Sequence, residues 1–562
     1  MATLQVVNPP ELPELILGVD LERVTNDAIV ALAKDVRVFQ RSGQLVGVVS
    51  VVDGPPLGKL RRSVGAPIIR SLAMPTLRER LASAAKWRRF DKKSKGYVPS
   101  LPPDVVVSGV AARGEWVGVR PLVSVVTSPC LKPDGQVLQA PGYDADTATL
   151  FSPREAYVAV PPEPTLEDAR GAVLQIREVV CDFPFARPEH ESAWIAGLLT
   201  MLARPAIAGP CPMFAVDATT RGTGKSRLVD AAVRIATGLD AARTAMPDDD
   251  DEMRKRITAL MLEGDPAVCV DNITRAITLP SLDNVLTATT WKDRMLGVTG
   301  NVTVPARAVW WATGNNLILG GDLSRRTVHI RLESPLENPE ERSNFKHANL
   351  LSWIGENRSR LVAAALTILR AYAFAGYPVV QCGRWGSYED WSRIVPAALV
   401  WAGMPDPLLA RATQAVDAEP EVHAIRVFLH GVRYYLDNVG RNSFGTRELL
   451  DHIYDEEGNA DLRESTDILA RASNGKHPTS LQLSGVLRRH RGRVLDQMRI
   501  AGVGLDSHVK SAQWTVERLG DRELTPNPPA PARTNPEPAA QGVPPVSQPT
   551  WQDAAPEDEW TL

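Results

Sequence analysis

Apolar residues gather in short runs between polar turns in the middle of the chain. Residues 213–217 form an apolar run of strand length, and apolar residues from 228 to 236 recur at helical intervals. Further strand-length runs lie at 266–270, 308–314 and 327–332. Strands that alternate with helical segments predict an α/β fold for this part of the chain.

The flanking regions show weaker patterns. Two β-rich runs, 104–107 and 122–126, are broken by turn formers at 132–135 and 141–144, which predicts a small β-rich module. After residue 420, helical segments precede two short strands, the order of a winged helix-turn-helix. The predicted domains are a basic N-terminal region of mixed α+β structure (1–100), the β-rich module (101–165), a central core (166–333), a helical segment (334–410), a winged-helix-like domain (420–520) and a disordered, acidic, proline-rich tail (521–562).

Composition restricts the class of protein. Of 562 residues, 44% are hydrophobic and 23% are charged, as in a globular protein, and the formal net charge is −3. Because this charge is slightly negative, any nucleic-acid site must be a local basic patch. Five widely spaced cysteines without a Cys-x-x-Cys pair argue against a zinc ribbon or a disulfide framework. The longest apolar stretches are too short to span a bilayer, so we expect a cytoplasmic protein without a membrane segment.

The segment after the first apolar run contains the strongest candidate chemistry. It reads Thr-Thr-Arg-Gly-Thr-Gly-Lys-Ser-Arg from 219 to 227, between a predicted strand and a predicted helix. Backbone amides of such a loop bind phosphate, Lys225 reaches the β and γ oxygens, and Ser226 helps to hold Mg²⁺. The pattern G-x-x-x-x-G-K-[ST] has glycine where this chain has Thr219, and an ordinary strand-to-helix turn is the alternative. The residues predicted to bind the nucleotide are Arg221, Gly222, Thr223, Gly224, Lys225, Ser226 and Arg227.

Further candidates follow the later apolar runs. Asp271 ends one run, where a carboxylate can hold Mg²⁺ through water. Asn315 follows the apolar run 308–314 and can orient an attacking water molecule. An asparagine-rich turn is the alternative. Arg325 and Arg326 precede the last run, and such arginines can complete the site of a neighbouring subunit. For this pair, a structural salt bridge is the alternative.

Two regions have the local positive charge that nucleic acids require. Residues 59–95 contain twelve lysines and arginines against two acids, and the segment 86–97 interleaves aromatic and cationic residues, as surfaces for single strands often do. A solvated helix face with a basic loop is the alternative. Residues 481–510 contain six cations against two aspartates, consistent with phosphate contacts or, alternatively, with a protein-docking module.

Taken together, these segments resemble a known family. The motifs are Gly-Thr-Gly-Lys-Ser (222–226), Val-Asp-Asn (270–272), a predicted hairpin (293–305), Ala-Thr-Gly-Asn-Asn (312–316) and Gly-Asp-Leu-Ser-Arg-Arg (321–326). They are similar to the AAA+ ATPase/helicase module of phage- and mobile-element-encoded primase-helicase replication proteins, which are related to superfamily III helicases. The resemblance implies a central P-loop AAA+ domain, built as a parallel sheet with flanking helices, and a helical lid.

The resemblance also implies roles and partners. Lys225, Asp271, Asn315 and either Arg325 or Arg326 would be catalytic, while Ser226 and Asp271 would hold Mg²⁺. ATP would bind between the subunits of a homo-oligomer, a hexamer in this family. The predicted hairpin, with Lys292, Arg294 and Arg307 near it, would contact single-stranded DNA in the channel of the ring. From the residues themselves, the order of elements and the positive charge suggest that the C-terminal domain binds duplex DNA. The tail, which has two tryptophans in an acidic strip, would bind a replication partner, with an inert tail as the alternative.

The expected function is therefore an ATP-dependent, ring-forming DNA helicase or translocase of phage or mobile-element replication. In the family, a catalytic glutamate usually follows the Walker B aspartate, whereas this chain has Asn272. Thr219 and Asn272 favour the alternative, an ATP-gated DNA-binding loader or switch with little hydrolysis. A regulatory or defence ATPase with a trigger other than DNA is a third hypothesis.

Overall fold

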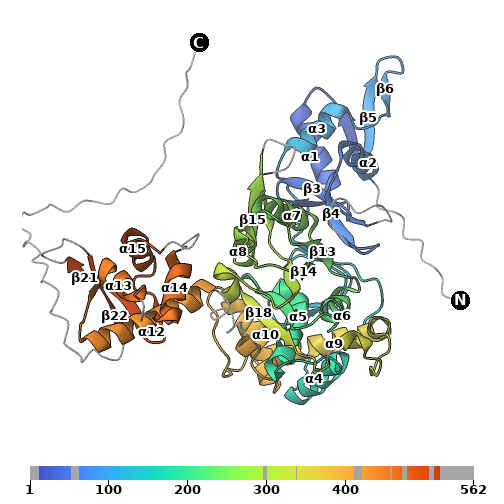
Figure 1. Cartoon of the computed structure of the whole chain (residues 1–562). Helices are drawn as coiled ribbons and strands as arrows, with labels where there is room; N and C mark the ends of the chain where they lie inside the picture. The colour runs from blue at the N-terminus through green and yellow to red at the C-terminus, as the bar shows by residue number, and fades with distance from the viewer. Residues whose placement is uncertain are drawn as a thin grey trace, which may run out of the picture. The chain divides into compact units, whose positions relative to one another are not determined.

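The computed structural model describes residues 12–51, 62–294, 300–336, 338–410, 420–455, 459–470, 477–505 and 512–518. The chain divides into two compact units, Met1–His423 and Ala424–Leu562 (Figure 1). The tail at 521–562 lies outside the described residues, so its disorder stays a prediction. The finer domain boundaries also stay predictions.

A five-stranded, fully parallel sheet forms the centre of the first unit. In spatial order its strands are β13 (Ala242–Ala245), β14 (Ala267–Ile273), β17 (Val309–Asn315), β12 (Met213–Ala218) and β18 (Thr327–Leu332). Along β12, β14 and β17, alternate residues are buried in two separate cores. Because both of their faces are buried, these three inner strands are largely apolar, whereas the outer strands β13 and β18 carry Arg243, His329 and Arg331.

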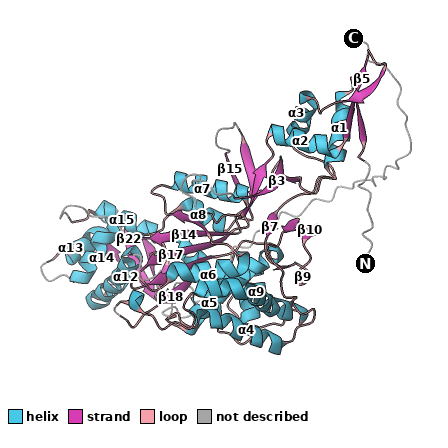
Figure 2. Ribbon diagram, turned by 90° about the vertical axis from the view of Figure 1, so that its right-hand side faces the viewer, coloured by secondary structure: helices cyan, strands magenta, loops and turns pink. Residues whose placement is uncertain are grey.

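Helices cover both faces of this sheet (Figure 2). One face packs against α4 (Leu166–Val180), α5 (Pro188–Ala203), α6 (Lys225–Thr237), α9 (Leu350–Phe374) and α10 (Glu389–Trp401). The other packs against α7 (Asp250–Glu263) and α8 (Pro280–Leu286). The expected α/β class and parallel sheet with flanking helices are confirmed. The predicted helical segment contains α9 and α10, whose buried residues share one core with α4, α5 and α6, so it is packed onto the central domain.

The N-terminal part of the first unit combines helices with small sheets. Its elements are β1 (Glu14–Leu17), α1 (Leu21–Leu32), β2 (Phe39–Arg41), β3 (Gln44–Ser50), β4 (Pro67–Ser71), α2 (Met74–Ala84), β5 (Lys86–Asp91), β6 (Gly96–Pro99) and α3 (Asp104–Ala112). Strands β1, β5 and β6 form one sheet, and β2, β3 and β4 form another. The segment 86–97 is thus a β-hairpin and its turn, not a helix face.

The strand expected at 104–107 is wrong, because these residues begin helix α3. Pro103 precedes the helix with an extended backbone, and Asp104 places a negative charge in the first turn, which favours a helix start. Val106, Val107 and Val110 are buried at helical spacing in the same core as α1 and α2. Tertiary packing therefore overrides the strand preference of the valine run.

The remaining part of the predicted β-rich module does contain strands. They are β7 (Ser124–Val126), β8 (Cys130–Leu131), β9 (Val137–Leu138), β10 (Gly142–Asp144) and β11 (Thr149–Phe151). The turn expected at 132–135 connects β8 to β9 and is confirmed. The turn expected at 141–144 is wrong, because residues 142–144 pair with β11 and the chain reverses after them.

The second unit contains helices followed by antiparallel strands. Its elements are α12 (Pro420–Val439), β19 (Phe444–Gly445), α13 (Thr446–Ile453), α14 (Ala460–Ala470), α15 (Ser480–Arg489), β20 (Val494–Leu495), β21 (Met498–Leu505) and β22 (Ala512–Arg518). The expected order of helices and then a hairpin is present, with sheet order β19-β22-β21-β20. The assignment as a DNA-binding winged helix stays a prediction. None of the helices in the described part of the chain is long and apolar enough to cross a membrane.

Candidate nucleotide site

The loop between β12 and α6 contains two glycines in the left-handed backbone region. It leaves the carboxyl end of β12 and runs directly into Lys225, the first residue of α6. Gly222 and Gly224 adopt φ of +77° and +86°, and a Cβ on Gly224 would lie 3.1 Å from the Phe183 ring. Both glycines are therefore required by conformation, and a Cβ on Gly222 would likewise meet the Glu340 side chain. Amides at such a helix N-terminus are suited to bind an anion.

Lys225 is bound to its own loop. Its Nζ donates to Thr220 O (3.2 Å) and to Thr223 Oγ1 (3.3 Å). Burial lowers the pKa of Lys225, and the negative charges of Asp217 and Asp271 offset only part of that shift. The ammonium is partly desolvated, so it interacts more strongly with an incoming anion than an exposed lysine does.

Asp271 on β14 is fixed by three neighbours. It accepts hydrogen bonds from Ser226 Oγ (3.0 Å), Thr313 Oγ1 (2.5 Å) and Arg243 Nη1 (2.5 Å). Burial raises the pKa of this carboxyl, but the Thr313 bond, the Arg243 charge and the Ser226 bond together lower it below its usual value. Asp271 is therefore ionised at neutral pH. The structure thus brings together Ser226 and Asp271, the two residues predicted to hold Mg²⁺.

Asn272, in the position where the resembling family has glutamate, lies in a special backbone conformation. Its φ is +56°, and the pairing of β14 with β17 shifts register between Val270 and Ile273. Asparagine visits this left-handed region more readily than glutamate does. The backbone N–H of Asn272 donates a hydrogen bond to Thr313 Oγ1 (3.0 Å), which stabilises this shift in register. The backbone accounts for asparagine at this position.

Replacing Asn272 with glutamate should therefore lower the free energy of unfolding of the first unit by roughly 1–2 kcal/mol, the cost of a left-handed residue. Asn272→Gly should change it by less than about 0.5 kcal/mol, because glycine adopts this φ without strain. Urea unfolding of both variants beside the unchanged protein measures the difference. Equal losses in the two variants would show that side-chain contacts, not φ, determine the cost.

The two arginines expected before β18 have different environments. Both lie in the short 3₁₀ helix η2 (Gly321–Arg326). Arg326 is 16% exposed and donates to Asp283 O (2.6 Å) and Asp322 Oδ2 (2.9 Å). Arg325 is 70% exposed and pairs with Asp322 at 2.8 Å. The salt-bridge alternative therefore describes Arg326, and Arg325 is the one available to a neighbour.

A large pocket opens beside the loop 221–227. Its volume is about 910 Å³, near the upper end of the usual range for ligand sites. Asn315, at the end of β17, lines it, and Asn315 Oδ1 is buried without a hydrogen-bond partner among the described residues. The pocket is lined by all seven loop residues 221–227, by Asn272 and Asn315, and by side chains from 179–184 and 334–350.

Several pocket and site residues have no signal in the sequence. Phe183 packs against Gly224, and Arg342 donates to Asp182 Oδ1 (3.0 Å) while it lies over the Phe345 ring at 4.8 Å. Arg243 on β13 joins Asp271 to Asp230. These residues are brought to the loop by folding alone, since none belongs to a local motif.

The predicted hairpin is present as β15 (Thr290–Arg294) paired antiparallel with β16 (Asn301–Pro305). Lys292 and Arg294 are exposed, whereas the turn at 295–299 lies outside the described residues. Arg307 does not belong to this exposed set, because its Nη1 donates to Ile207 O (2.7 Å) and burial lowers its pKa to about 10. Arg307 therefore ties the link between β16 and β17 to the segment at Ile207.

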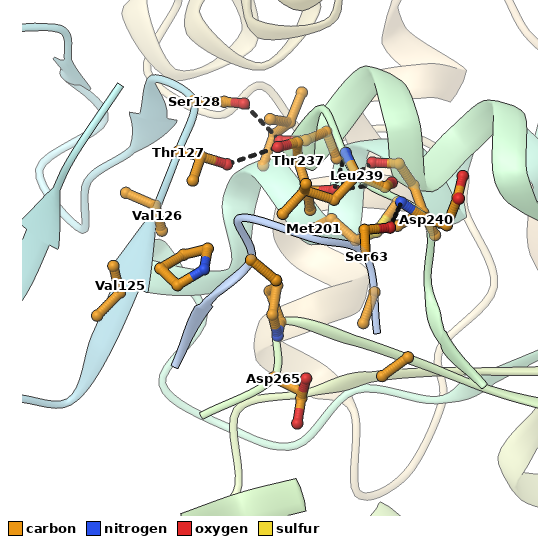
Figure 3. Close-up of a pocket in the computed structure, with 18 of the residues that line it drawn as sticks. Ser63, Val125, Val126, Thr127, Ser128, Met201, Thr237, Leu239, Asp240 and Asp265 are labelled. Carbon is orange, nitrogen blue, oxygen red and sulfur yellow. Dashed lines mark hydrogen bonds between the residues drawn. The ribbon is translucent and has the colours of Figure 1, made fainter. Parts of the chain in front are cut away.

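A second cavity lies where the N-terminal part meets the end of α6 (Figure 3). Its volume of about 50 Å³ has room for only a few water molecules. Thr127 Oγ1 donates to Thr237 O (2.7 Å), and Asp240 N donates to Ser63 Oγ (3.0 Å). The two hydrogen bonds pair these polar groups with each other. The cavity therefore belongs to the packing contact between the N-terminal part and the end of α6.

No protein-family model matches the chain, and no curated protein matches it. Solved structures are similar to it at low identity. The A form apo structure of the NrS-1 C-terminal region is 12% identical, with 84% of this chain and 95% of that chain covered and a TM-score of 0.35. The SCCmec type IV Cch active helicase is 12% identical, with 72% and 82% covered and a TM-score of 0.29. The JCV helicase is 12% identical, with 49% and 74% covered and a TM-score of 0.21. Scores this low assign neither a family nor an activity, so the functional argument rests on the site itself.

Proposed function

We propose that this chain is a ring-forming ATPase that works as a DNA helicase or translocase. The observation that carries the proposal is the hydrogen bond between Ser226 and Asp271. Ser226 belongs to the glycine loop 221–227, and this loop lines a pocket of about 910 Å³. A helix N-terminus, a lysine and an ionised carboxylate then converge where a nucleoside triphosphate needs amides, a cation and a metal site.

The residues present fit Mg²⁺ and ATP. Ser226 and Asp271 supply the hydroxyl and carboxylate oxygens that Mg²⁺ prefers, and a metal bound there would neutralise phosphate charge. Asn315 Oδ1, buried without a partner in the described part of the chain, is suited to accept a hydrogen bond from a water or ligand group. Lys225 would bind the terminal phosphates, and Arg325 would reach the pocket of the next subunit in a homo-oligomer, which we propose to be a hexamer.

DNA is the proposed partner. The exposed Lys292 and Arg294 on the β15–β16 hairpin would contact a single strand in the channel of the ring. In the second unit, α15 ends with Arg488 and Arg489, which suits contacts of that unit with duplex phosphates.

The first test is ATP hydrolysis without DNA, with single strands and with duplex. Lys225→Ala should lower turnover by about 10²–10³-fold, because the charge developing on the phosphates loses its cation. Lys255→Ala, which removes an exposed lysine from α7, is the matched control and should keep full turnover. Stimulation by single strands that disappears in Lys225→Ala supports a motor, whereas intact turnover in that variant would rule out the site.

A second candidate is an ATP-gated DNA-binding loader or switch. Asn272 favours it, because an amide at this position cannot act as the general base that activates water. Under this alternative the protein would bind nucleotide and assemble on DNA without steady turnover. Nucleotide-dependent assembly combined with absent hydrolysis would place this candidate first.

A further inference from the structure

The β1-β5-β6 sheet has one face packed on helices and one face open to solvent. Leu15 and Trp87 are buried against α1, α2 and α3, and Trp87 Nε1 donates to Leu81 O (2.8 Å). Because side chains alternate along a strand, Ile16 and Phe90 point to the opposite face, where they are 38% and 54% exposed. Figure 1 and Figure 2 show the β5–β6 hairpin extending past these helices.

Two aromatic rings lie side by side on this open face. Phe90 on β5 and Tyr97 on β6 are direct cross-strand partners, and each is about half exposed. Their ring centroids are 5.6 Å apart in an edge-to-face arrangement. Folding has packed Trp87 of the same hairpin into the core but leaves these two rings in water. Exposed ring faces of this kind are platforms on which unpaired bases stack.

Cations surround the pair. The turn between the strands presents Lys92, Lys93 and Lys95, all exposed, and Asp91 Oδ2 accepts from Ser94 N (2.9 Å), which orders the turn. Residues 86–99 contain six cations against one acid, although Arg88 is paired with Glu14 of β1 (2.5 Å). Phosphate groups would therefore find positive charge mainly at the turn lysines beside the rings.

We propose that this open sheet face binds a single-stranded nucleic acid, with bases stacked on Phe90 and Tyr97 and phosphates beside the three turn lysines. A single strand is favoured over a duplex because only unpaired bases offer their faces to a side chain. This surface is separate from the nucleotide pocket and goes beyond the proposed function, since it requires no ATP.

The test measures binding of labelled oligo(dT) to the full chain without nucleotide, over a series of salt concentrations. Phe90→Leu and Tyr97→Leu should each weaken binding about tenfold, because leucine keeps apolar volume but has no ring face. The salt dependence should stay unchanged in both variants. Replacing Lys92, Lys93 and Lys95 with glutamine should instead lower the slope of log affinity against log salt by about two.

Phe374→Leu removes a half-exposed ring from α9 and is the matched control, expected to bind as the unchanged protein does. Lys225→Ala should also keep full binding, so failure of the ATPase proposal would leave this result unaffected. The affinity for oligo(rU), measured in parallel with that for oligo(dT), shows whether the protein prefers RNA or DNA. A preference for either single strand is consistent with the proposal. Unchanged oligo(dT) affinity in Phe90→Leu and Tyr97→Leu, or equal losses for duplex, would overturn it.

Discussion

Arg325→Ala is expected to lower ATP turnover by about 10³–10⁵-fold, the range measured for arginines that complete a neighbouring phosphoryl-transfer site. The Arg325 side chain is 70% exposed, pairs with Asp322, and is not among the residues that line the pocket of its own chain. Nucleotide binding by the isolated subunit should therefore be unchanged. Steady-state hydrolysis and equilibrium binding of a labelled nucleotide measure the two effects separately.

Arg326→Ala is the matched control, because Arg326 is the next residue but is mostly buried. Its loss should lower stability, since it removes the hydrogen bond to Asp283 O and the ion pairs with Asp283 and Asp322.

Mixing the Lys225→Ala variant with the Arg325→Ala variant tests whether Arg325 acts on a neighbouring subunit. When equal amounts of the two variants form rings at random, about a quarter of the interfaces combine an intact Lys225 with an intact Arg325. Turnover should therefore recover to roughly a quarter of that of the unchanged protein. Absence of recovery in mixed rings that do form would show that Arg325 does not act on a neighbour.

Local motifs could be predicted from the sequence because every residue they need is adjacent in the chain. The run at 213–217, the glycine loop and the helix after it are consecutive, and the strand and the helix appear where expected as β12 and α6, joined by that loop. Ser226 and Asp271 were each predicted to hold Mg²⁺. They come into contact because parallel strands end at the same edge of a sheet.

Contacts between distant segments could not be predicted. Arg243 reaches Asp271 because β13 and β14 are neighbours, a pairing that no local pattern encodes. The valines at 105–107 favour a strand by propensity, yet packing against α1 and α2 makes them helical. The resemblance predicts glutamate at position 272, and the chain has asparagine there. The reason is visible only in the structure, where this residue has a positive φ.

Asp217→Ala is expected to lower the free energy of unfolding of the first unit by about 3–5 kcal/mol, the usual cost of leaving a buried charge without its partner. Asp217 lies on β12 and is 1% exposed. Its carboxylate is bound to Arg331 and to His329 Nε2 (3.3 Å), and it accepts a hydrogen bond from Leu317 N (3.0 Å). Removing it takes the closest acidic partner from the mostly buried Arg331, which keeps only the longer contacts with Glu333 (3.5 Å) and Asn316 (3.3 Å).

The pH dependence of stability separates this ion-pair network from simple packing. Burial raises the pKa of Asp217, but the hydrogen bonds from His329 and Leu317 and the Arg331 charge outweigh it, so the folded pKa lies below the usual value. Stability from this group is then fully present above the unfolded pKa of about 3.9 and is lost as pH falls through the lower folded pKa. Asp217→Asn keeps the volume and the Leu317 bond but does not titrate, so its urea midpoint should be lower at neutral pH and should decline less between about pH 5 and pH 2. An acid profile identical to that of the unchanged protein would mean that other carboxylates dominate acid unfolding and that the Asp217 network contributes little.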